Sequence, residues 1–91
     1  MADSSSAWFV YLVRCRDGSL YCGIAKDLTR RVEEHNSADK GAKYTRGRRP
    51  VQLVYVEEAA SRGTATQREG RIKRLSRARK MMLIQDGTSP Q

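Results

Sequence analysis

The sequence predicts a small α+β domain with elements in the order strand, strand, helix, strand, helix, helix. Two runs of β-branched and aromatic residues flank the dipeptide Asp17-Gly18, which is typical of a β-hairpin. Two later segments place apolar residues at helical spacing after capping residues. A chain of 91 residues is long enough for one small domain. We expect that domain at residues 8–85, a disordered tail at residues 1–7 and a second tail at residues 86–91.

The charge balance favours a polyanionic partner. The chain has 18 Lys and Arg against 10 Asp and Glu, a net charge of +8, which suits nucleic acid, although such an excess also serves solubility. The longest apolar run, residues 7–13, is far shorter than a membrane span, and residues 1–6 lack the basic start of a secretory signal. Two cysteines and one histidine are too few for a structural zinc site. We expect a cytoplasmic, reduced protein with no membrane partner.

The hairpin carries one tyrosine on each strand, and its register decides how the two are related. With a two-residue loop, Tyr11 and Tyr21 point to opposite faces of the sheet. With a three-residue loop that ends in a left-handed Gly18, both phenols share one face. Composition alone favours two ordinary strand aromatics. In neither register do Cys15 and Cys22 face each other, so we expect no disulfide.

Both faces of the first strand are apolar, which predicts a central strand covered on both sides. The segment AKDLTRRVEEHN then predicts a helix capped by Asp27. On this helix Leu28, Arg31 and His35 share one stripe, whereas Glu34 is expected mostly on another face. The ordinary interpretations are a surface arginine and a histidine whose charge is favourable at the helix end.

Residues 37–50 form a basic loop around one aromatic side chain. Such interleaving suits phosphate contact combined with base stacking, and a solvated run of charges is an equal alternative. The candidate nucleic-acid contacts in this loop are Lys40, Lys43, Tyr44, Arg46, Arg48 and Arg49.

Residues 51–57 predict the third strand, and Pro50 at its start is tolerated because a strand's first residue can lack an N–H. Residues 61–75 predict the second helix. Its first turn has two candidate caps, Ser61 and a capping box that begins at Thr64.

The second helix places one carboxylate on its apolar stripe. Ala65, Ile72 and Leu75 define the stripe, and Glu69 falls on it. Burial of an unpaired charge is unfavourable, so Glu69 needs a cationic partner or a metal, the ordinary choice being an ion pair with an arginine.

A dense basic series begins within the second helix and continues through Arg77, Arg79 and Lys80. Residues 81–84 then predict a last short helix whose apolar side packs back on the domain. Four members of the series are further candidate contacts to nucleic acid: Arg68, Arg71, Lys73 and Arg74.

Together these features resemble the GIY-YIG nuclease domain, over nearly the whole chain from Trp8 to Ile84. The triplet at residues 9–11, Phe-Val-Tyr, stands where the family has Gly-Ile-Tyr, and the triplet at residues 21–23 keeps the tyrosine and the glycine. The runs CGIAKDLTRRVEEHN and REGRIKRLSRARK are similar to the small stand-alone members. More specific than either triplet is the spacing of five residues: Tyr11, Tyr21, Arg31, His35 and Glu69.

The resemblance implies an α+β fold in which helices flank a small three-stranded antiparallel sheet, in the order β-β-α-β-α-α. That order agrees with the one predicted from the residues. It also implies that both tyrosines share one face, which favours the three-residue hairpin loop.

The resemblance further implies phosphodiester cleavage assisted by one divalent metal, Mg²⁺ first and Mn²⁺ as the alternative. By position, Glu69 is the implied metal ligand and Arg31 the residue that holds the phosphate. Tyr11 or Tyr21 orients or deprotonates the attacking water, and His35 assists by hydrogen bonding or proton transfer. A phenol with a pKa of about 10 is a poor base unless positive charge favours the phenolate.

The leading hypothesis is therefore a metal-dependent endonuclease. Its substrate is DNA in preference to RNA, with repair or recombination structures as candidates, and a protein partner supplies substrate specificity. The alternatives are a non-catalytic basic module that binds nucleic acid and an adaptor that retains the nuclease fold.

Overall fold

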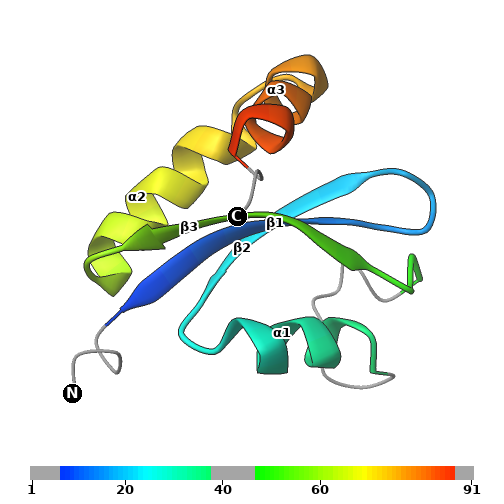
Figure 1. The fold of residues 1–91 in the computed structure, drawn as a ribbon, viewed down its shortest axis with the longest axis horizontal. Helices are drawn as coiled ribbons and strands as arrows, with labels where there is room; N and C mark the ends of the chain where they lie inside the picture. The colour runs from blue at the N-terminus through cyan, green and yellow to red at the C-terminus, as the bar shows by residue number, and fades with distance from the viewer. Residues whose placement is uncertain (1–6, 38–46, 88–91) are drawn as a thin grey trace.

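The computed structural model describes residues 7–37 and 47–87, and these residues form one three-stranded sheet with three helices (Figure 1). The sheet is antiparallel with strand order β2-β1-β3, and the predicted α+β class and element order are confirmed. No helix in this part of the chain is both long enough and apolar enough to cross a membrane. The elements are β1 (Trp8–Arg14), β2 (Leu20–Ala25), α1 (Leu28–His35), β3 (Gln52–Ala59), α2 (Arg62–Lys73) and α3 (Arg77–Gly87).

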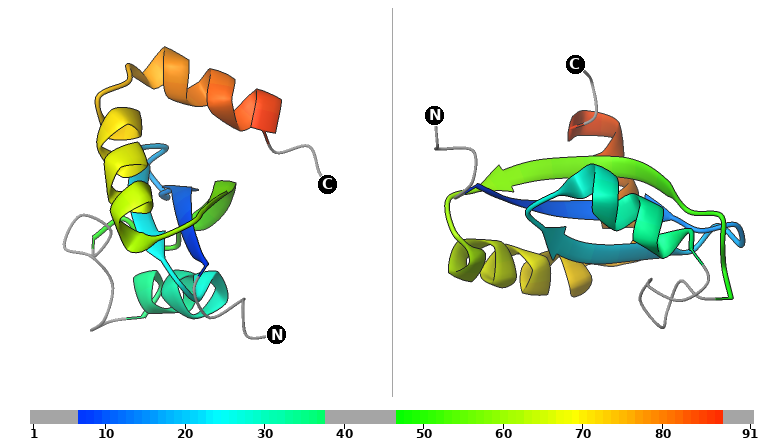
Figure 2. Two further views of the ribbon diagram at one scale, coloured as in Figure 1. Left: turned by 90° about the vertical axis from the view of Figure 1, so that its left-hand side faces the viewer. Right: turned by 90° about the horizontal axis from the view of Figure 1, so that it is seen from below.

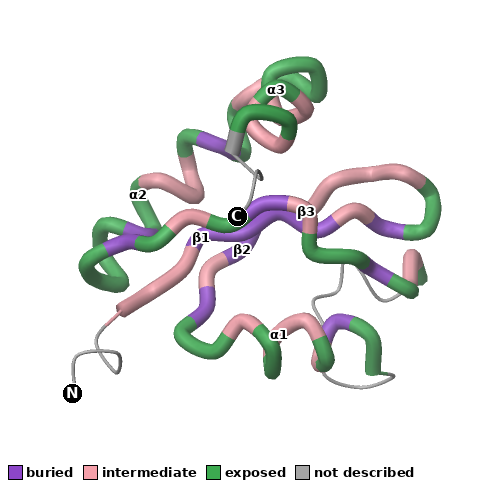
Figure 3. Tube along the Cα trace, in the orientation of Figure 1, coloured by how far each residue is buried: buried purple, intermediate pink, exposed green. Residues whose placement is uncertain are grey.

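Strand β1 lies at the centre of the sheet because both of its faces are apolar. Val10 and Leu12 face α2 and α3, whereas Tyr11 and Val13 face the side of α1, and each is at most 1% exposed. Figure 2 shows the helices on the two sides of the sheet, and Figure 3 shows that buried residues concentrate along β1. The predicted cover on both faces is therefore confirmed.

The hairpin adopts the three-residue register. Tyr11 lies opposite Gly23 and Val13 opposite Tyr21, so both tyrosines share a face. Gly18 closes the turn at a φ of +87°, a conformation that glycine adopts without strain. This register is the one that the family resemblance implies, and the two-residue alternative is excluded.

The two cysteines lie on opposite faces of the sheet. Cys22 belongs to the cluster under α2, and Cys15 belongs to the cluster under α1. Both are buried and free, which confirms that no disulfide forms.

Helix α1 is fixed at both ends. The carboxylate of Asp27 accepts a hydrogen bond from the Arg30 amide at 3.1 Å, so the predicted cap is confirmed. At the other end the side chain of Asn36 accepts from the Val51 amide at 2.7 Å and donates to the Val51 carbonyl at 3.2 Å. These two hydrogen bonds tie the last turn of α1, with His35, to the start of β3.

The later elements differ from the predictions at their ends. Ser61 caps α2 by accepting from the Thr64 amide at 3.1 Å, so the capping box that begins at Thr64 is wrong. Strand β3 continues to Ala59 because the longer β1 offers Trp8 as its partner there. Helix α3 starts four residues before the predicted one, because the Ser76 hydroxyl accepts from an amide of its first turn.

Candidate active site

A buried phenol and imidazole form the centre of the site. Tyr11 from the middle of β1 and His35 from the last turn of α1 are hydrogen-bonded, with 2.8 Å between Oη and Nε2. Their exposed fractions are 1% and 0%. Gly23, opposite Tyr11 on β2, makes room for the phenol, because a Cβ at this position would lie 2.5 Å from Oη. The glycine of the second triplet is therefore required by close packing.

Tyr21 completes an aromatic group on the same face. Its ring lies edge-on to His35, with 5.4 Å between the ring centroids, and the Tyr11 and His35 centroids are 5.8 Å apart. Tyr21 is only half-buried, because β2 is an edge strand of the sheet. The two phenols thus contact one histidine, one from the inside and one from the edge.

Arg31 lies one turn before His35 and is held by Glu34. Its Nη1 is 2.8 Å from Oε1 of Glu34, and the two side chains are 29% and 24% exposed. Burial lowers the pKa of Arg31, but hydrogen bonding with Glu34 and Tyr11 outweighs burial, and the pKa is raised overall. The helical pattern had predicted Glu34 mostly on another face. The signal for the contact was the i, i+3 spacing of the two opposite charges.

The protonation states of this group follow from burial. Burial raises the pKa of Tyr11 to about 12, although the adjacent Arg31 lowers it. Burial and the Arg31 charge lower the pKa of His35 to about 4. Near neutral pH the group therefore holds a neutral phenol and a neutral imidazole, and the interpretation of His35 as a favourable helix-end charge is wrong.

The direction of one hydrogen bond on Tyr11 is fixed by chemistry, and that of the other follows the tautomer of His35. A guanidinium can only donate, so the Tyr11 oxygen accepts from Arg31. With the imidazole proton on Nδ1, Nε2 of His35 accepts from the Tyr11 hydroxyl. Arg31, Tyr11 and His35 form a chain along which a proton can move toward the histidine.

Glu69 approaches the edge of β2 from the other helical layer. Its side chain is 20% exposed, and its Oε2 lies 3.3 Å from Nζ of Lys73. The same Nζ lies 5.9 Å from the centre of the Tyr21 ring. The expected cationic partner of Glu69 is thus a lysine and not an arginine. Lys73 links the carboxylate on α2 to the aromatic group under α1.

The described residues contain no group of three or more His, Cys, Asp or Glu side chains that could hold a metal together. Glu69 nevertheless fits as a single ligand, because its carboxylate is partly exposed and, among residues 7–37 and 47–87, is ion-paired with Lys73 alone. Magnesium commonly binds through one or two carboxylates and keeps several waters or substrate oxygens.

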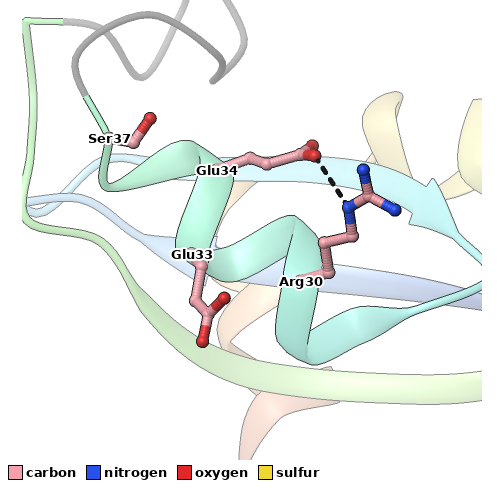
Figure 4. A pocket seen from close by; sticks show the side chains of 4 residues that line it. All are labelled: Arg30, Glu33, Glu34 and Ser37. Atoms are coloured by element: carbon pink, nitrogen blue, oxygen red, sulfur yellow. Dashed lines mark ion pairs between the residues drawn. The ribbon is translucent and has the colours of Figure 1, made fainter.

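The outer side of α1 carries two carboxylates, which would repel a phosphate. A hollow of about 270 Å³ is lined by Arg30, Glu33, Glu34 and Ser37, with Arg30 3.4 Å from Glu34 (Figure 4). Two carboxylates make this hollow unsuitable for a phosphate. Its role in the site is indirect, because Glu34 also holds Arg31.

The predicted nucleic-acid contacts on α2 fall into two groups. Arg68 donates to Glu57 at 2.8 Å, and Tyr55 donates to the same carboxylate, so Arg68 ties α2 to β3. This hydrogen bond raises the pKa of Arg68. Arg71 and Arg74 are exposed, whereas the exposed Lys73 is ion-paired with Glu69.

The predicted contacts in the basic loop are only partly described. Arg48 lies beside the hairpin turn, with its Nε 3.0 Å from Oδ2 of Asp17. Arg49 donates to the backbone carbonyl of Ser37. Outside the described residues lie Lys40, Lys43, Tyr44 and Arg46.

Comparison with known proteins identifies the family. The family model described as the GIY-YIG catalytic domain matches residues 7–82, which span β1 to α3 and contain the whole site. The chain belongs to the GIY-YIG family. The GIY-YIG domain is a nuclease domain, so its substrate class is nucleic acid, and the resemblance found in the sequence is confirmed.

Relatives of this GIY-YIG domain include proteins named UPF0213. One from Desulfotalea psychrophila is 56% identical over 78 residues, which cover 86% of this chain and 71% of the relative. Another from Staphylococcus epidermidis is 53% identical over 79 residues, which cover 87% and 95%. A solution NMR structure of a UPF0213 protein from Bacillus halodurans superimposes with a TM-score of 0.59 at 40% identity, covering 92% of this chain and 88% of that one.

Proposed function

We propose that this GIY-YIG domain is a metal-dependent endonuclease that cleaves phosphodiester bonds in DNA. The observation that carries the proposal is the hydrogen bond of 2.8 Å between Tyr11 and His35, with Arg31 on the same phenol. A neutral imidazole that accepts from a phenol supplies the proton acceptor that hydrolysis needs. A buried histidine whose pKa is strongly lowered by burial and by an adjacent cation is typical of a functional site.

The proton transfer is assigned to Tyr11 and His35. As water attacks the phosphorus, its proton passes to the Tyr11 oxygen while the phenol proton passes to Nε2 of His35. This concerted path avoids a free phenolate, which burial disfavours by raising the Tyr11 pKa to about 12. Tyr21, half-buried at the edge of the same face, orients the water.

Charge stabilisation is assigned to Arg31 and Glu69. Arg31 stays protonated and offsets the negative charge that develops on the phosphate. Glu69 would hold a divalent ion, Mg²⁺ or Mn²⁺, whose charge when bound polarises the phosphate and stabilises the leaving oxygen. The scissile phosphate would then lie at the β2 edge between α1 and α2.

A nicking assay on supercoiled plasmid tests the proposal. We expect nicking with magnesium or manganese, loss of nicking in EDTA, and at least a hundredfold lower rate for Glu69→Ala. Glu33→Ala is the matched control, because it removes an exposed carboxylate from the outer side of α1. Equal nicking by both variants would contradict the assignment of Glu69.

The same preparation tests the second candidate, a binding module without catalysis. Its support is the net charge of +8 and the exposed cations of α2. Salt-sensitive DNA binding by wild type, with no nicking of plasmid or of branched DNA in either metal, would favour the binding module.

A further inference from the structure

A basic hollow lies at the hairpin end of β2. It has a volume of about 200 Å³ and is lined by Ser19, Leu20, Arg77 and Lys80. Arg77 fixes its shape by donating from Nη1 to the Gly18 carbonyl at 2.9 Å. The first turn of α3 is thus held against the hairpin turn, with two cations at the rim.

The positive charge of this hollow is not offset locally. In the part of the chain that the structure describes, neither Arg77 nor Lys80 forms an ion pair. Asp17 is the acid on the adjoining turn, and it is already engaged by the Ser19 hydroxyl at 2.6 Å and by Arg48 at 3.0 Å. Cations in the first turn of a helix are also disfavoured by the helix dipole, and α3 has no acid there. A bound anion would relieve both effects.

The hollow adjoins the candidate active site. Leu20, in its wall, precedes Tyr21 on β2, and the Tyr21 ring lies 5.9 Å from Nζ of Lys73. Burial raises the pKa of the Cys22 thiol to about 12, while Lys73 and Lys80 both lower it. Both ammonium groups therefore act on the same stretch of β2, on the side of the sheet that carries Glu69.

We propose that this hollow is a phosphate subsite, which holds a non-reacting phosphodiester group of the DNA strand being cleaved. The inference rests on the proposed function. Arg77 and Lys80 donate to the non-bridging oxygens, since both hydrogen-bond donors of Ser19 are taken by Asp17. One fixed phosphate beside the scissile one sets the register of the strand without reading its sequence.

A solvated surface charge is the competing explanation, and α3 provides a matched control for it. Arg79 is exposed in the same helical turn as Lys80 but lines a different hollow, with Leu75 and Met82. Lys80→Ala and Arg79→Ala each remove one positive charge from the helix. Both leave in place the bond from Arg77 that anchors α3 to the hairpin.

The experiment measures binding of a short labelled DNA duplex by fluorescence anisotropy in EDTA, between about 50 and 200 mM salt. We expect Lys80→Ala to reduce the slope of log K against log salt by about 1, and Arg79→Ala to keep the wild-type slope. Unchanged slopes in both variants, or equal reductions in both, would overturn the subsite. Thermal melting of each variant confirms that it is folded.

Failure of the subsite and failure of the proposed function give different results. Because the binding assay contains EDTA, it does not depend on cleavage. Metal-dependent nicking by wild type with equal slopes in the two variants would remove the subsite and leave the nuclease. Absence of nicking, with a slope change confined to Lys80→Ala, would remove the nuclease and leave the phosphate site. A wild type that binds no DNA at any salt concentration would overturn the subsite.

Discussion

At the scale of single residues, the site depends on one missing side chain. Gly23 lies opposite Tyr11, and a methyl group there would overlap the phenol. Gly70, in the interior of α2, has open space where its Cβ would be. Gly23 is therefore needed for packing beside the site, whereas nothing in the structure explains Gly70.

Alanine substitution at these positions should have opposite effects. We expect Gly23→Ala to lower the free energy of unfolding by about 1–3 kcal/mol, because the phenol and its bond to His35 must shift. Gly70→Ala should raise it by about 0.5–1 kcal/mol, since alanine favours the helix. Urea denaturation measures both changes. An unchanged free energy of unfolding in Gly23→Ala would mean that Tyr11 shifts without cost.

The buried histidine makes stability depend on pH. The pKa of His35 is lowered to about 4, so below its ordinary value of 6.5 the unfolded chain binds a proton that the folded protein does not. Stability therefore decreases as the pH falls from about 6.5 toward 4. We expect about 2 kcal/mol less unfolding free energy at pH 5 than at pH 7.

The measurement compares urea denaturation of wild type and His35→Gln at these two pH values. The chain has one histidine, so the variant should lose most of the dependence. An NMR titration of the His35 ring provides the direct check. A ring that titrates near 6.5 in the folded protein would contradict the prediction.

At the scale of elements, the site requires α1 to keep a fixed position under the sheet. Asn36 provides the link by exchanging two hydrogen bonds with the backbone of Val51. It follows His35 directly, so the last turn of α1 and the start of β3 are held together where the imidazole meets Tyr11.

Asn36→Ala should therefore disturb both stability and the site. We expect a loss of about 1–3 kcal/mol in unfolding free energy, since the backbone groups of Val51 lose their partners. Ser37→Ala is the control, because Ser37 accepts from Arg49 through its backbone carbonyl, and its effect should stay within about 0.5 kcal/mol. Equal losses in the two variants would show that the link is not specific.

The sequence predicted what periodicity and turn residues encode. The order of elements, the Asp27 cap and the central position of β1 follow from such local patterns. The hairpin register did not follow from composition, because loops of two and three residues fit the same turn residues. It came from the family resemblance and is confirmed by the structure.

The local sequence pattern did not predict the contacts that long side chains make. Glu34 turns back to Arg31, and Lys73 reaches from α2 to Tyr21, through choices of rotamer that spacing does not determine. Helix α3 was predicted too short because the prediction rested on its apolar residues 81–84, whereas its first turn is basic, which opposes the helix dipole. That departure from local preference occurs at the proposed phosphate subsite, where such conflicts are expected.

At the scale of the whole molecule, charge is divided between the two helical layers. The outer side of α1 carries the hollow with Glu33 and Glu34, whereas α2 and the start of α3 present cations such as Lys73 and Lys80. We therefore expect DNA to approach the side of the sheet that carries α2 and α3 in preference to the outer side of α1. The proposed scissile position at the β2 edge lies at the boundary between them.

This division predicts the binding face. Titration of ¹⁵N-labelled protein with a short DNA duplex in EDTA should shift the amide signals of β2, α2 and the first turn of α3, and leave Glu33 on the outer side of α1 unaffected. Raising the salt concentration should reverse the shifts, because phosphate contacts release counterions. Shifts centred on the outer side of α1 would contradict the prediction and would place the strand away from both Glu69 and the hollow at Lys80.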